Sequence, residues 1–238
     1  MTQTQPTAHG VLRLFSGLAT KPALESAVLP AFRARTGVAV ETVYEPTSVL
    51  LQLIDSGERF DVLVGVTGSV DALVRQGTVS SVSVRPIARS GIGVACAGAP
   101  DPGGFTDVDA FIARLRAARS VAYSRSGASG IYFAELLERL GIREEIDARA
   151  TVLEKGFTAE ALFDGRADLA VQQVSELLAV PGANFLGALP DTVQSFTDFS
   201  AGIALGSARL DDAAGLIEAM TDEPATAAFT ATGLEPAR

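Results

Sequence analysis

The chain has 238 residues, 47% of them hydrophobic and 20% charged, so it can bury a substantial core as one large domain or as two lobes. Its formal net charge of −9 argues against nucleic acid or an anionic membrane surface as the partner. No stretch approaches the roughly 18 consecutive apolar residues of a membrane span, so membrane insertion is not expected. The single cysteine, Cys96, and the single histidine, His9, argue against a disulfide, a zinc site or a histidine-based triad, and we predict no metal and no cofactor.

Residues 1–9 are polar and are expected to form a flexible N-terminus. The first ten residues lack the charged and apolar regions of a secretory signal. Two locations therefore stay open. The protein is cytoplasmic if the sequence is complete as given, and it is periplasmic or secreted if a signal peptide has been removed.

The first part of the chain repeats a strand, a short loop and a helix. Apolar runs predict strands over 11–15, 38–44 and 60–66, with helices from about Pro22 to Gly37, from Val49 and over 69–76. This alternation is typical of a parallel sheet that is covered by helices on both faces. In such folds, ligands bind beyond the carboxyl ends of the strands.

Polar residues follow two of these strands at the point where a ligand would bind. Ser16 and Gly17 follow the first strand, and Thr47 and Ser48 follow the second. Hydroxyls and the free N–H groups of a helix start can bind an anion there. Serine and threonine are also preferred helix N-caps, so a purely structural role is the alternative.

A second α/β unit is expected over about 87–194. It begins with a long extended stretch over 86–95, which predicts a strand crossing from one lobe into the other. A strand over 196–204 is expected to return to the first lobe. The remaining expected elements are a turn over 100–104, strands over 120–123, 150–153 and 167–173, and helices over 107–118, 131–140, 158–165, 210–220 and 225–231.

The turn after the strand over 120–123 combines small, hydroxyl and basic residues. Glycines in this turn allow the backbone to approach a ligand closely. The following helix start adds free N–H groups, so the turn predicts an anion site with extra donors, although an ordinary helix cap would have a similar sequence. The donor side chains are those of Ser124, Arg125, Ser126 and Ser129.

These elements predict an α/β protein of two Rossmann-like lobes that are joined by two crossing strands, with a cleft between the lobes. We expect lobe 1 to comprise residues 10–85 and 197–238, and lobe 2 to comprise residues 86–196. The hinge is expected near residues 83–86 and 194–200.

Eight short segments, taken together and in this order, carry a family resemblance over almost the whole chain. They are Leu14–Gly17, Phe32–Val40, Phe60–Val62, Ile87–Ala95, Ser129–Ile131, Leu140–Ile142, Gln172–Leu177 and Gly233–Pro236. The chain resembles the type II periplasmic solute-binding proteins, and within them the molybdate-binding-protein-like group. The resemblance implies a two-lobed clamp that closes on a small anionic ligand, an ABC transporter permease as a candidate partner, and a monomer.

The resemblance also bears on the ligand. Ser16, Thr47 and Ser48 match the positions at which molybdate binders of this family hold the oxyanion. The tyrosine that these binders supply from the second lobe has no clear match, because the corresponding strand end carries Gln172 and Gln173.

Two arginines are expected near the cleft, Arg89 beside Ser90 and Arg125 in the turn described above. Arginine forks and paired amides suit flat carboxylates better than compact tetrahedral anions. We therefore expect an organic di- or tricarboxylate rather than molybdate as the ligand.

A second hypothesis places an enzyme in the same clamp, since the group includes aconitate-isomerase-like members that act on small unsaturated tricarboxylates. A 1,3-proton shift beside carboxylates needs a base, a returned proton and stabilisation of negative charge. The candidate groups are Tyr123, Ser16 and Glu176, with Ser124 beside them, and none of them forms a specific catalytic signature.

Three of these residues have a plain structural alternative. Arg89 could pair with a surface carboxylate, and Tyr123 could be a core residue whose hydroxyl is satisfied. Glu176 could simply favour the dipole of a helix that starts at Ser175.

Overall fold

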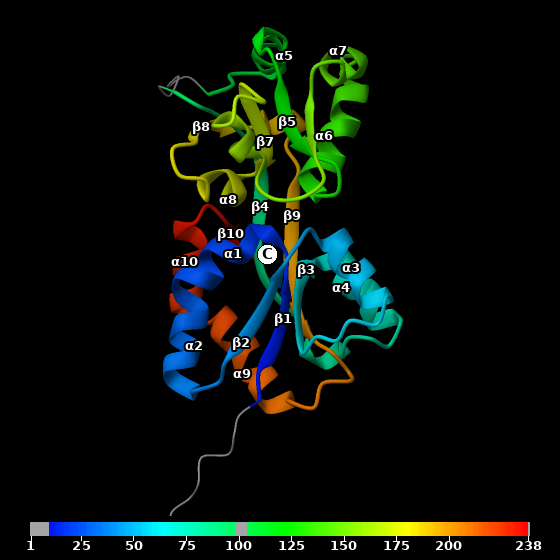
Figure 1. Ribbon diagram of the computed structural model, residues 1–238, viewed down its shortest axis with the longest axis vertical. Helices are drawn as coiled ribbons and strands as arrows, with labels where there is room; N and C mark the ends of the chain where they lie inside the picture. The colour runs from blue at the N-terminus through cyan, green and yellow to red at the C-terminus, as the bar shows by residue number, and fades with distance from the viewer. Residues whose placement is uncertain (1–9, 99–103, 238) are drawn as a thin grey trace, which may run out of the picture.

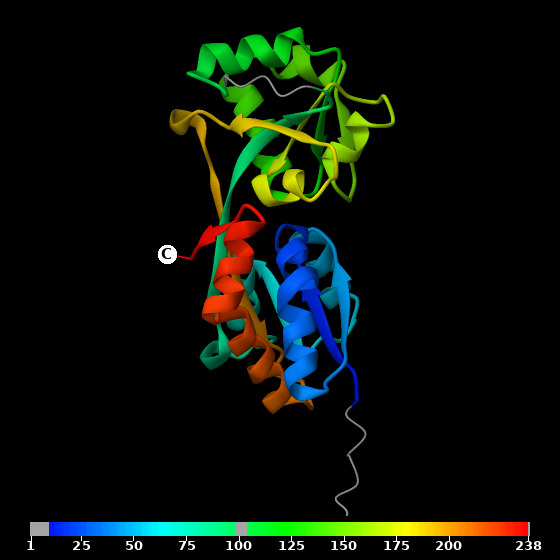
Figure 2. The same cartoon turned by 90° about the vertical axis from the view of Figure 1, so that its left-hand side faces the viewer.

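The computed structural model describes residues 10–98 and 104–237, which form two lobes stacked along the long axis of the molecule (Figure 1). Two strands run from one lobe to the other, as Figure 2 shows. We call the half that holds the first strand lobe 1, and the other half lobe 2. The expected flexible N-terminus at 1–9 and most of the expected turn at 100–104 lie outside the described residues.

Lobe 1 contains the three parallel strands that the sequence predicts. They are β1 (Leu12–Ser16), β2 (Val40–Tyr44) and β3 (Val62–Val66), with β1 in the middle. Two antiparallel strands complete this part of the sheet, so that its order is β2-β1-β3-β9-β4. These are β9 (Phe196–Ile203), which pairs with β3, and β4 (Arg85–Cys96), which pairs with β9.

Helices cover both faces of the lobe 1 sheet, because its strands are apolar on both sides. Leu14 and Val62 pack on one face and Phe15 and Leu63 on the other, as the two-residue period of a strand requires. The helical elements of this lobe are η1 (Leu18–Thr20), α1 (Lys21–Ala23), the π-helix η2 (Leu24–Val28), α2 (Leu29–Thr36), α3 (Thr47–Asp55), α4 (Thr67–Arg75), η3 (Ser81–Ser83), α9 (Leu210–Thr221) and α10 (Glu223–Ala231).

Lobe 2 continues the sheet from the second half of β4, in the order β4-β7-β5-β6. The added strands are β5 (Val121–Ser124), β6 (Thr151–Leu153) and β7 (Leu169–Gln173), and β8 (Asn184–Ala188) pairs with the other edge of β4. The helical elements are α5 (Val108–Ala117), α6 (Ala128–Arg139), α7 (Arg143–Asp147), η4 (Thr158–Leu162), α8 (Val174–Leu178) and η5 (Asp191–Val193).

Lobe 2 has its own two-sided core. Phe111 and Phe133 pack with Tyr123 on one face of the sheet, and a layer of small residues that includes Ala122 and Ala170 packs on the other. The expected helix over 158–165 is a shorter 3₁₀ helix, and α6 begins at Ala128 rather than near residue 131. Ser129 therefore lies in the first turn of α6 and not in the loop before it.

The two expected crossing strands are confirmed. β4 and β9 pair over Arg85–Gly91 and Phe196–Ala201, which ties them together where they pass between the lobes. A two-residue strand, β10 (Glu235–Pro236), pairs with β4 opposite Arg89. The division into residues 10–85 plus 197–238 and residues 86–196 stays a prediction.

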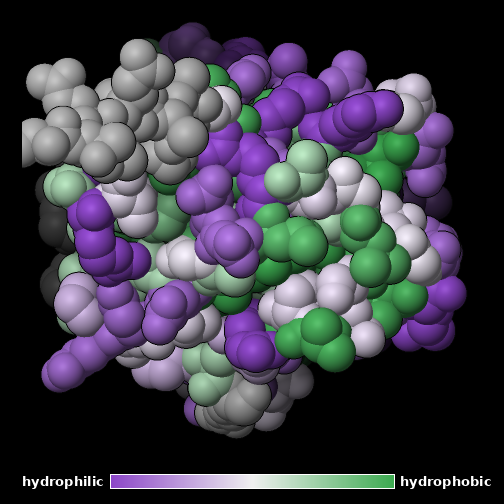
Figure 3. Space-filling model, turned by 90° about the horizontal axis from the view of Figure 1, so that it is seen from below, coloured by the Kyte–Doolittle hydropathy of each residue, from purple (hydrophilic) through white to green (hydrophobic). Residues whose placement is uncertain are grey.

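The end of lobe 1 that faces away from lobe 2 is a mosaic of hydrophilic and hydrophobic residues (Figure 3). Several large apolar side chains are exposed near this end, among them Val82, Leu205 and Leu210. Among the described residues, no helix has the length and apolar character that crossing a bilayer requires.

Candidate functional site

A cavity lies between the two lobes, at the carboxyl ends of several strands. The cavity itself is small, with a volume of about 30 Å³, and it lies within a recess of about 390 Å³ that includes open solvent. Both lobes contribute to its wall, as expected for a cleft in this fold. The lining residues are Gly17, Leu18, Ala19, Pro46, Thr47, Val66 and Phe199 from lobe 1, and Ser124, Gly127, Ala128, Ser129, Gln172, Gln173 and Glu176 from lobe 2.

Five helical elements begin at this cavity. The N-cap residues of η1, α3, α4, α6 and α8 all belong to its lining, and each has an extended backbone that directs the helix away from the cavity. None of these five ends, which all lie within the described residues, has a side-chain cap. The first N–H groups of a helix have no acceptor within the helix and carry partial positive charge. Their convergence makes the cavity favourable for an anion.

A glycine sets the position of α6 against the end of β5. A Cβ atom added to Gly130 would lie 1.7 Å from the carbonyl oxygen of Ser124, so the helix could not approach the strand so closely with any other residue. The close approach brings the first turn of α6 to the cavity wall. The hydroxyl of Ser124 supports the turn by accepting a hydrogen bond of 2.9 Å from the N–H of Gly127.

Two hydroxyls face the cavity with a proton to donate. Thr47 Oγ1 accepts a hydrogen bond of 3.2 Å from the N–H of Val66, and within the described residues its own proton has no acceptor. Ser129 is 2% exposed, and its hydroxyl makes no hydrogen bond to any described residue. Both groups come from helix starts, Thr47 in lobe 1 and Ser129 in lobe 2, so they can contact one ligand from opposite sides.

Ser16 does not line the cavity, contrary to the expectation that it binds ligand. It is fully buried, and its hydroxyl lies 2.7 Å from that of Thr20 and donates to the carbonyl of Gly17. The neighbouring Gly17 does line the cavity. Ser16 therefore fixes the turn into η1, which corresponds to the structural alternative.

Ser48 and Ser126 connect the lobes rather than line the cavity. Ser48 Oγ donates a hydrogen bond of 2.8 Å to the carbonyl of Ser126, across the cleft from α3 to the turn after β5. The hydroxyl of Ser126 donates in turn to the carbonyl of Glu154. Both residues are thus placed beside the site, and the structure describes the lobes in contact.

Neither expected arginine lies in the cavity wall. Arg125 is directed to solvent, with its side chain 64% exposed, and it pairs with Glu154 at 2.6 Å. Arg89 is largely buried, pairs with Asp198 at 3.5 Å and stacks 4.1 Å above the ring of Phe196. Both guanidinium groups have other partners in this structure, and the expectation that arginine forks hold the ligand stays a prediction.

Tyr123 is likewise absent from the cavity wall. Its ring packs edge-on against Phe133, and its hydroxyl donates a hydrogen bond of 2.7 Å to Asp147. Burial, together with the Asp147 carboxylate, raises the pKa of Tyr123 to about 12. A tyrosine held in this way is a core residue with a satisfied hydroxyl, and its proposed catalytic role is not supported by its position.

The two glutamines at the end of β7 do line the cavity, but much of their hydrogen bonding is internal. Gln172 accepts from the N–H and the hydroxyl of Thr158, at 2.7 and 3.0 Å, and donates to Gly156. Gln173 lies 2.7 Å from the hydroxyl of Thr197 in β9. The amide orientation that satisfies both of its ends accepts from Thr197 and donates to the carbonyls of Ser90 and Gly91.

Ser90 is fully buried and donates to the carbonyl of Gly91, so its hydroxyl is not presented to a ligand. Gln173 therefore joins α8 and β7 to both crossing strands at the base of the cleft. This is a structural function in addition to its place in the cavity wall.

Glu176 is the one titratable side chain among the described residues that line the cavity. It is 7% exposed, and burial raises its pKa to about 8 despite hydrogen bonds with the backbone of Gln173 and the side chain of Gln172, which act in the opposite direction. Its position in the first turn of α8 agrees with a helix-start carboxylate. The same position also places an acid–base group against any bound ligand.

The apolar part of the wall was not anticipated from the sequence. Leu18, Val66 and Phe199 line the cavity beside the polar groups. The signal was available for Val66 and Leu18, because each lies where a predicted strand passes into the next helix. Phe199 could not be found in this way, since β9 reaches the cavity only by inserting between β3 and β4.

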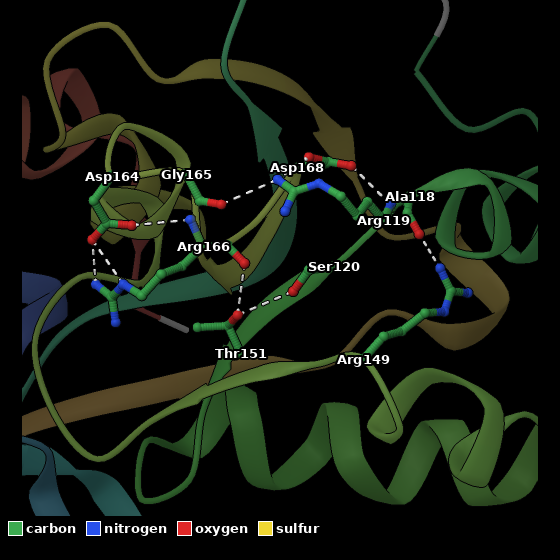
Figure 4. Close-up of polar contacts among 9 residues, drawn as sticks. All are labelled: Ala118, Arg119, Ser120, Arg149, Thr151, Asp164, Gly165, Arg166 and Asp168. Carbon is green, nitrogen blue, oxygen red and sulfur yellow. Dashed lines mark hydrogen bonds and ion pairs between the residues drawn. The ribbon is translucent and has the colours of Figure 1, made fainter.

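A second hollow lies on lobe 2 and is lined by Cys96, Arg119, Gly165 and Asp168, among others. Two of its polar side chains, Arg119 and Asp168, are paired, as Figure 4 shows. Arg119 donates to the Gly165 carbonyl at 3.1 Å and to Asp168 at 2.9 Å. This surface therefore offers fewer free donors than the interlobe cavity. Across the described residues, no three His, Cys, Asp or Glu side chains gather in a way that could hold a metal ion.

Comparison with known proteins places this geometry in context. Residues 12–235 match the family described as bacterial extracellular solute-binding protein. An aconitate isomerase from Pseudomonas sp. is 32% identical over 216 residues, which is 88% of this chain and 82% of that protein. The periplasmic molybdate-binding protein of Azotobacter vinelandii has a similar fold, with a TM-score of 0.80 and 19% identity over 95% of this chain and 100% of that one. A sulfate-binding protein of Mycobacterium tuberculosis gives a TM-score of 0.72 and 19% identity over 96% and 87% of the two chains.

Proposed function

The chain belongs to the bacterial extracellular solute-binding proteins, and we propose that its interlobe cavity binds a small organic anion with two or three carboxylates. The observation that carries this proposal is the composition of the cavity wall, in which uncapped helix starts and free hydroxyls lie beside apolar side chains. The helix starts and hydroxyls suit the oxygens of an anion. The apolar side chains suit its carbon skeleton.

The relatives favour an organic anion as the ligand of this chain. The aconitate isomerase that is 32% identical is named for a tricarboxylate. The molybdate- and sulfate-binding proteins are 19% identical, and their likeness concerns the fold alone. The absence of an arginine from the described cavity wall removes one argument for carboxylates, so the proposal depends on the apolar wall and on the isomerase relative.

A thermal-shift panel followed by calorimetry tests the ligand class. The panel contains citrate, cis- and trans-aconitate, tricarballylate and shorter dicarboxylates, with molybdate, tungstate, sulfate and phosphate as the inorganic set. We expect stabilisation by one or more tricarboxylates and little by the inorganic anions. Stabilisation by molybdate or sulfate alone would contradict the proposal. Thr47→Val serves as the matched site variant, since it removes the hydroxyl and keeps the shape of the side chain.

As a binding protein, the chain would close around its ligand by bending of β4 and β9 between the lobes and would deliver the ligand to an ABC transporter permease. We expect a monomer that works outside the cytoplasm, in keeping with its family. Scattering with and without ligand tests the closure, and it also gives the oligomeric state. Fractionation of the native host, followed by detection of the protein, tests the compartment.

One observation favours a second candidate function, the isomerisation of an unsaturated tricarboxylate. Glu176 places a carboxyl group with a pKa of about 8 in the cavity wall, and general acid–base groups work best when their pKa lies near the working pH. The ionised carboxyl would remove a proton from a methylene carbon beside a carboxylate. The same group would return a proton at the far carbon after the double bond has moved, so no proton is gained or lost overall. The helix starts would stabilise the intermediate negative charge.

Proton NMR of cis-aconitate in D₂O separates the two functions. Conversion to trans-aconitate, or uptake of deuterium into the ligand, would establish an isomerase, and we then expect Glu176→Gln to lower the rate by at least about a hundredfold. An unchanged spectrum of a ligand that binds would leave binding as the function. Arg125→Ala, which changes a side chain outside the cavity wall, is the control for both measurements.

A further inference from the structure

Glu176 lies in a cavity whose other polar groups suit an anion. The charge of the Glu176 carboxyl group therefore matters for binding. Glu176 is buried and belongs to the cavity wall, as do Ser129 and Gln173. Within the described residues, no basic side chain lies within 4.0 Å of it, and the groups that favour its ionised form are the Gln173 backbone and the Gln172 side chain. An ionised carboxylate in this position would repel the anion that the helix starts attract.

The charged groups on the elements that pack against α8 do not neutralise Glu176. β7 and β8 carry no titratable side chain, and β4 carries Arg85, Arg89 and Cys96. Lys21 follows η1, which also contacts α8, and the segment after α10 packs against α8 through Gly233, two residues before Glu235. None of these groups is among the causes that shift the pKa of Glu176, which are burial and its two hydrogen bonds.

The cations have partners of their own. Arg89 is paired with Asp198, and Arg85 donates to main-chain carbonyls that include that of Val84. The ammonium group of Lys21 lies 5.2 Å from the ring centre of Tyr44. Glu176 therefore enters the cavity without a counter-ion.

We propose that Glu176 is neutral when an anion is bound and donates a hydrogen bond to it, so that binding above the titration range of Glu176 takes up one proton from solvent. This proposal rests on the proposed anion-binding function of the cavity. It adds that the site responds to pH, because the neutral carboxyl is a donor and the ionised carboxyl is both an acceptor and a repelling charge. The proton goes from solvent to the Glu176 carboxylate, and no covalent bond to the ligand forms.

The test is calorimetric titration of the whole chain with tricarballylate, which has no double bond to move and is fully ionised above pH 7. We expect the dissociation constant to be nearly constant up to about pH 8 and then to rise by about tenfold per pH unit. At pH 9, the binding heat should also depend on the ionisation enthalpy of the buffer, in proportion to about one proton taken up.

Glu176→Gln supplies the matched variant, since an amide is a neutral donor of the same shape. We expect this variant to lose the pH dependence of tricarballylate binding between pH 7 and pH 10, whatever its affinity at pH 7. A dissociation constant of the unaltered chain that is constant from pH 7 to pH 10 would overturn the proposal. A rise of the dissociation constant above pH 8 that is retained in a folded Glu176→Gln variant would overturn it too.

Failure of the proposed function has a different signature. If tricarballylate and the other carboxylates of the panel do not bind at any pH, the ligand class is wrong. Sulfate, which carries no proton over this range, is then the probe for the same titration. Proton uptake by the unaltered chain needs no variant, so the proposal stays testable if Glu176→Gln does not fold.

Discussion

Ser48 in the first turn of α3 donates a hydrogen bond of 2.8 Å to the main-chain carbonyl of Ser126, so that a helix start of lobe 1 touches the turn that precedes a helix start of lobe 2. The acceptor is a backbone atom, and no side chain of lobe 2 has to be ordered to form the bond. Thr47, the preceding residue, presents its hydroxyl to the cavity. The same helix start therefore contacts both the ligand space and the opposite lobe.

Ser48→Ala should weaken ligand binding without unfolding the chain. A net hydrogen bond contributes about 0.5–1.5 kcal/mol, which corresponds to a roughly two- to tenfold rise in the dissociation constant if the bond forms only when the lobes meet. Calorimetry with the best anion of the panel measures this change, and the melting temperature of the ligand-free chain should stay the same. An unaltered dissociation constant would show that the contact exists equally in the open and closed states.

Ser129→Ala should weaken anion binding by roughly tenfold, since it removes a hydroxyl that can donate to a charged ligand. Arg125→Ala, four residues earlier, should change the dissociation constant by less than about twofold, because this exposed side chain pairs with Glu154. The two variants are compared in one calorimetric series. If Arg125→Ala raised the dissociation constant more than Ser129→Ala, Arg125 rather than Ser129 would contact the ligand.

Lys21 lies between aromatic rings of the two lobes, 5.2 Å from the centre of Tyr44 and 5.9 Å from that of Phe157. A partly exposed cation–π contact contributes about 0.5–1 kcal/mol, so Lys21→Met should weaken binding by roughly two- to fivefold. Lys21→Arg, which keeps a cation over the rings, should restore most of the affinity. If Lys21→Met and Phe157→Leu were strictly additive in a double-mutant cycle, the contact would not join the lobes.

Gly130→Ala should destabilise the chain by about 3 kcal/mol or more, because the new methyl group would lie 1.7 Å from the Ser124 carbonyl oxygen. Chemical denaturation measures the free energy of unfolding. Gly68→Ala in α4 is the control, since an added Cβ there meets no atom within 4 Å, and we expect it to be neutral or slightly stabilising. Equal effects of the two substitutions would show that α6 can move away from β5 at little cost.

The stability of the ligand-free chain should depend on pH through Glu176. Its pKa is raised from 4.5 to about 8, so the neutral form is favoured in the folded state. The contribution of this pKa shift to the free energy of unfolding is fully present below pH 4.5. It decreases by about 1.4 kcal/mol per pH unit as the pH rises towards 8. The free energy of unfolding of the unaltered chain, relative to that of Glu176→Gln, should fall between pH 4.5 and pH 8. Above pH 8 the difference between the two proteins should stay constant. A difference that does not change between pH 5 and pH 9 would mean that Glu176 is ionised throughout.

The strands and most of the helices could be predicted from local patterns. The apolar runs that gave β1, β2 and β3 are continuous because both faces of the sheet are covered, and glycines at positions 37 and 77 end the following helices with a positive φ. β8 and β10 could not be predicted in this way. β8 contains Gly187 and pairs with β4 through a register shift, and β10 has two residues.

The site could be located from the sequence, but the direction of its side chains could not always be derived. Strand ends and helix starts pointed to Gly17, Thr47, Ser124, Ser129, Gln172, Gln173 and Glu176, which all line the cavity, and their contact with a ligand stays a prediction. Arg125 turns away because Glu154, which is distant in sequence, lies beside it. The two-residue period of β5 could have placed Tyr123 correctly, since it shares a core face with Val121.

The insertion of β9 between β3 and β4 has a consequence for the order in which the chain folds. All the strands that follow β4 in lobe 2 are complete by residue 188, whereas the lobe 1 sheet needs residues 196–203 to join β3 to β4. During synthesis on a ribosome, lobe 1 would therefore begin first and complete its fold last. Until then, the edge of β3 that pairs with β9 stays open, and an open strand edge favours aggregation of the partly made chain.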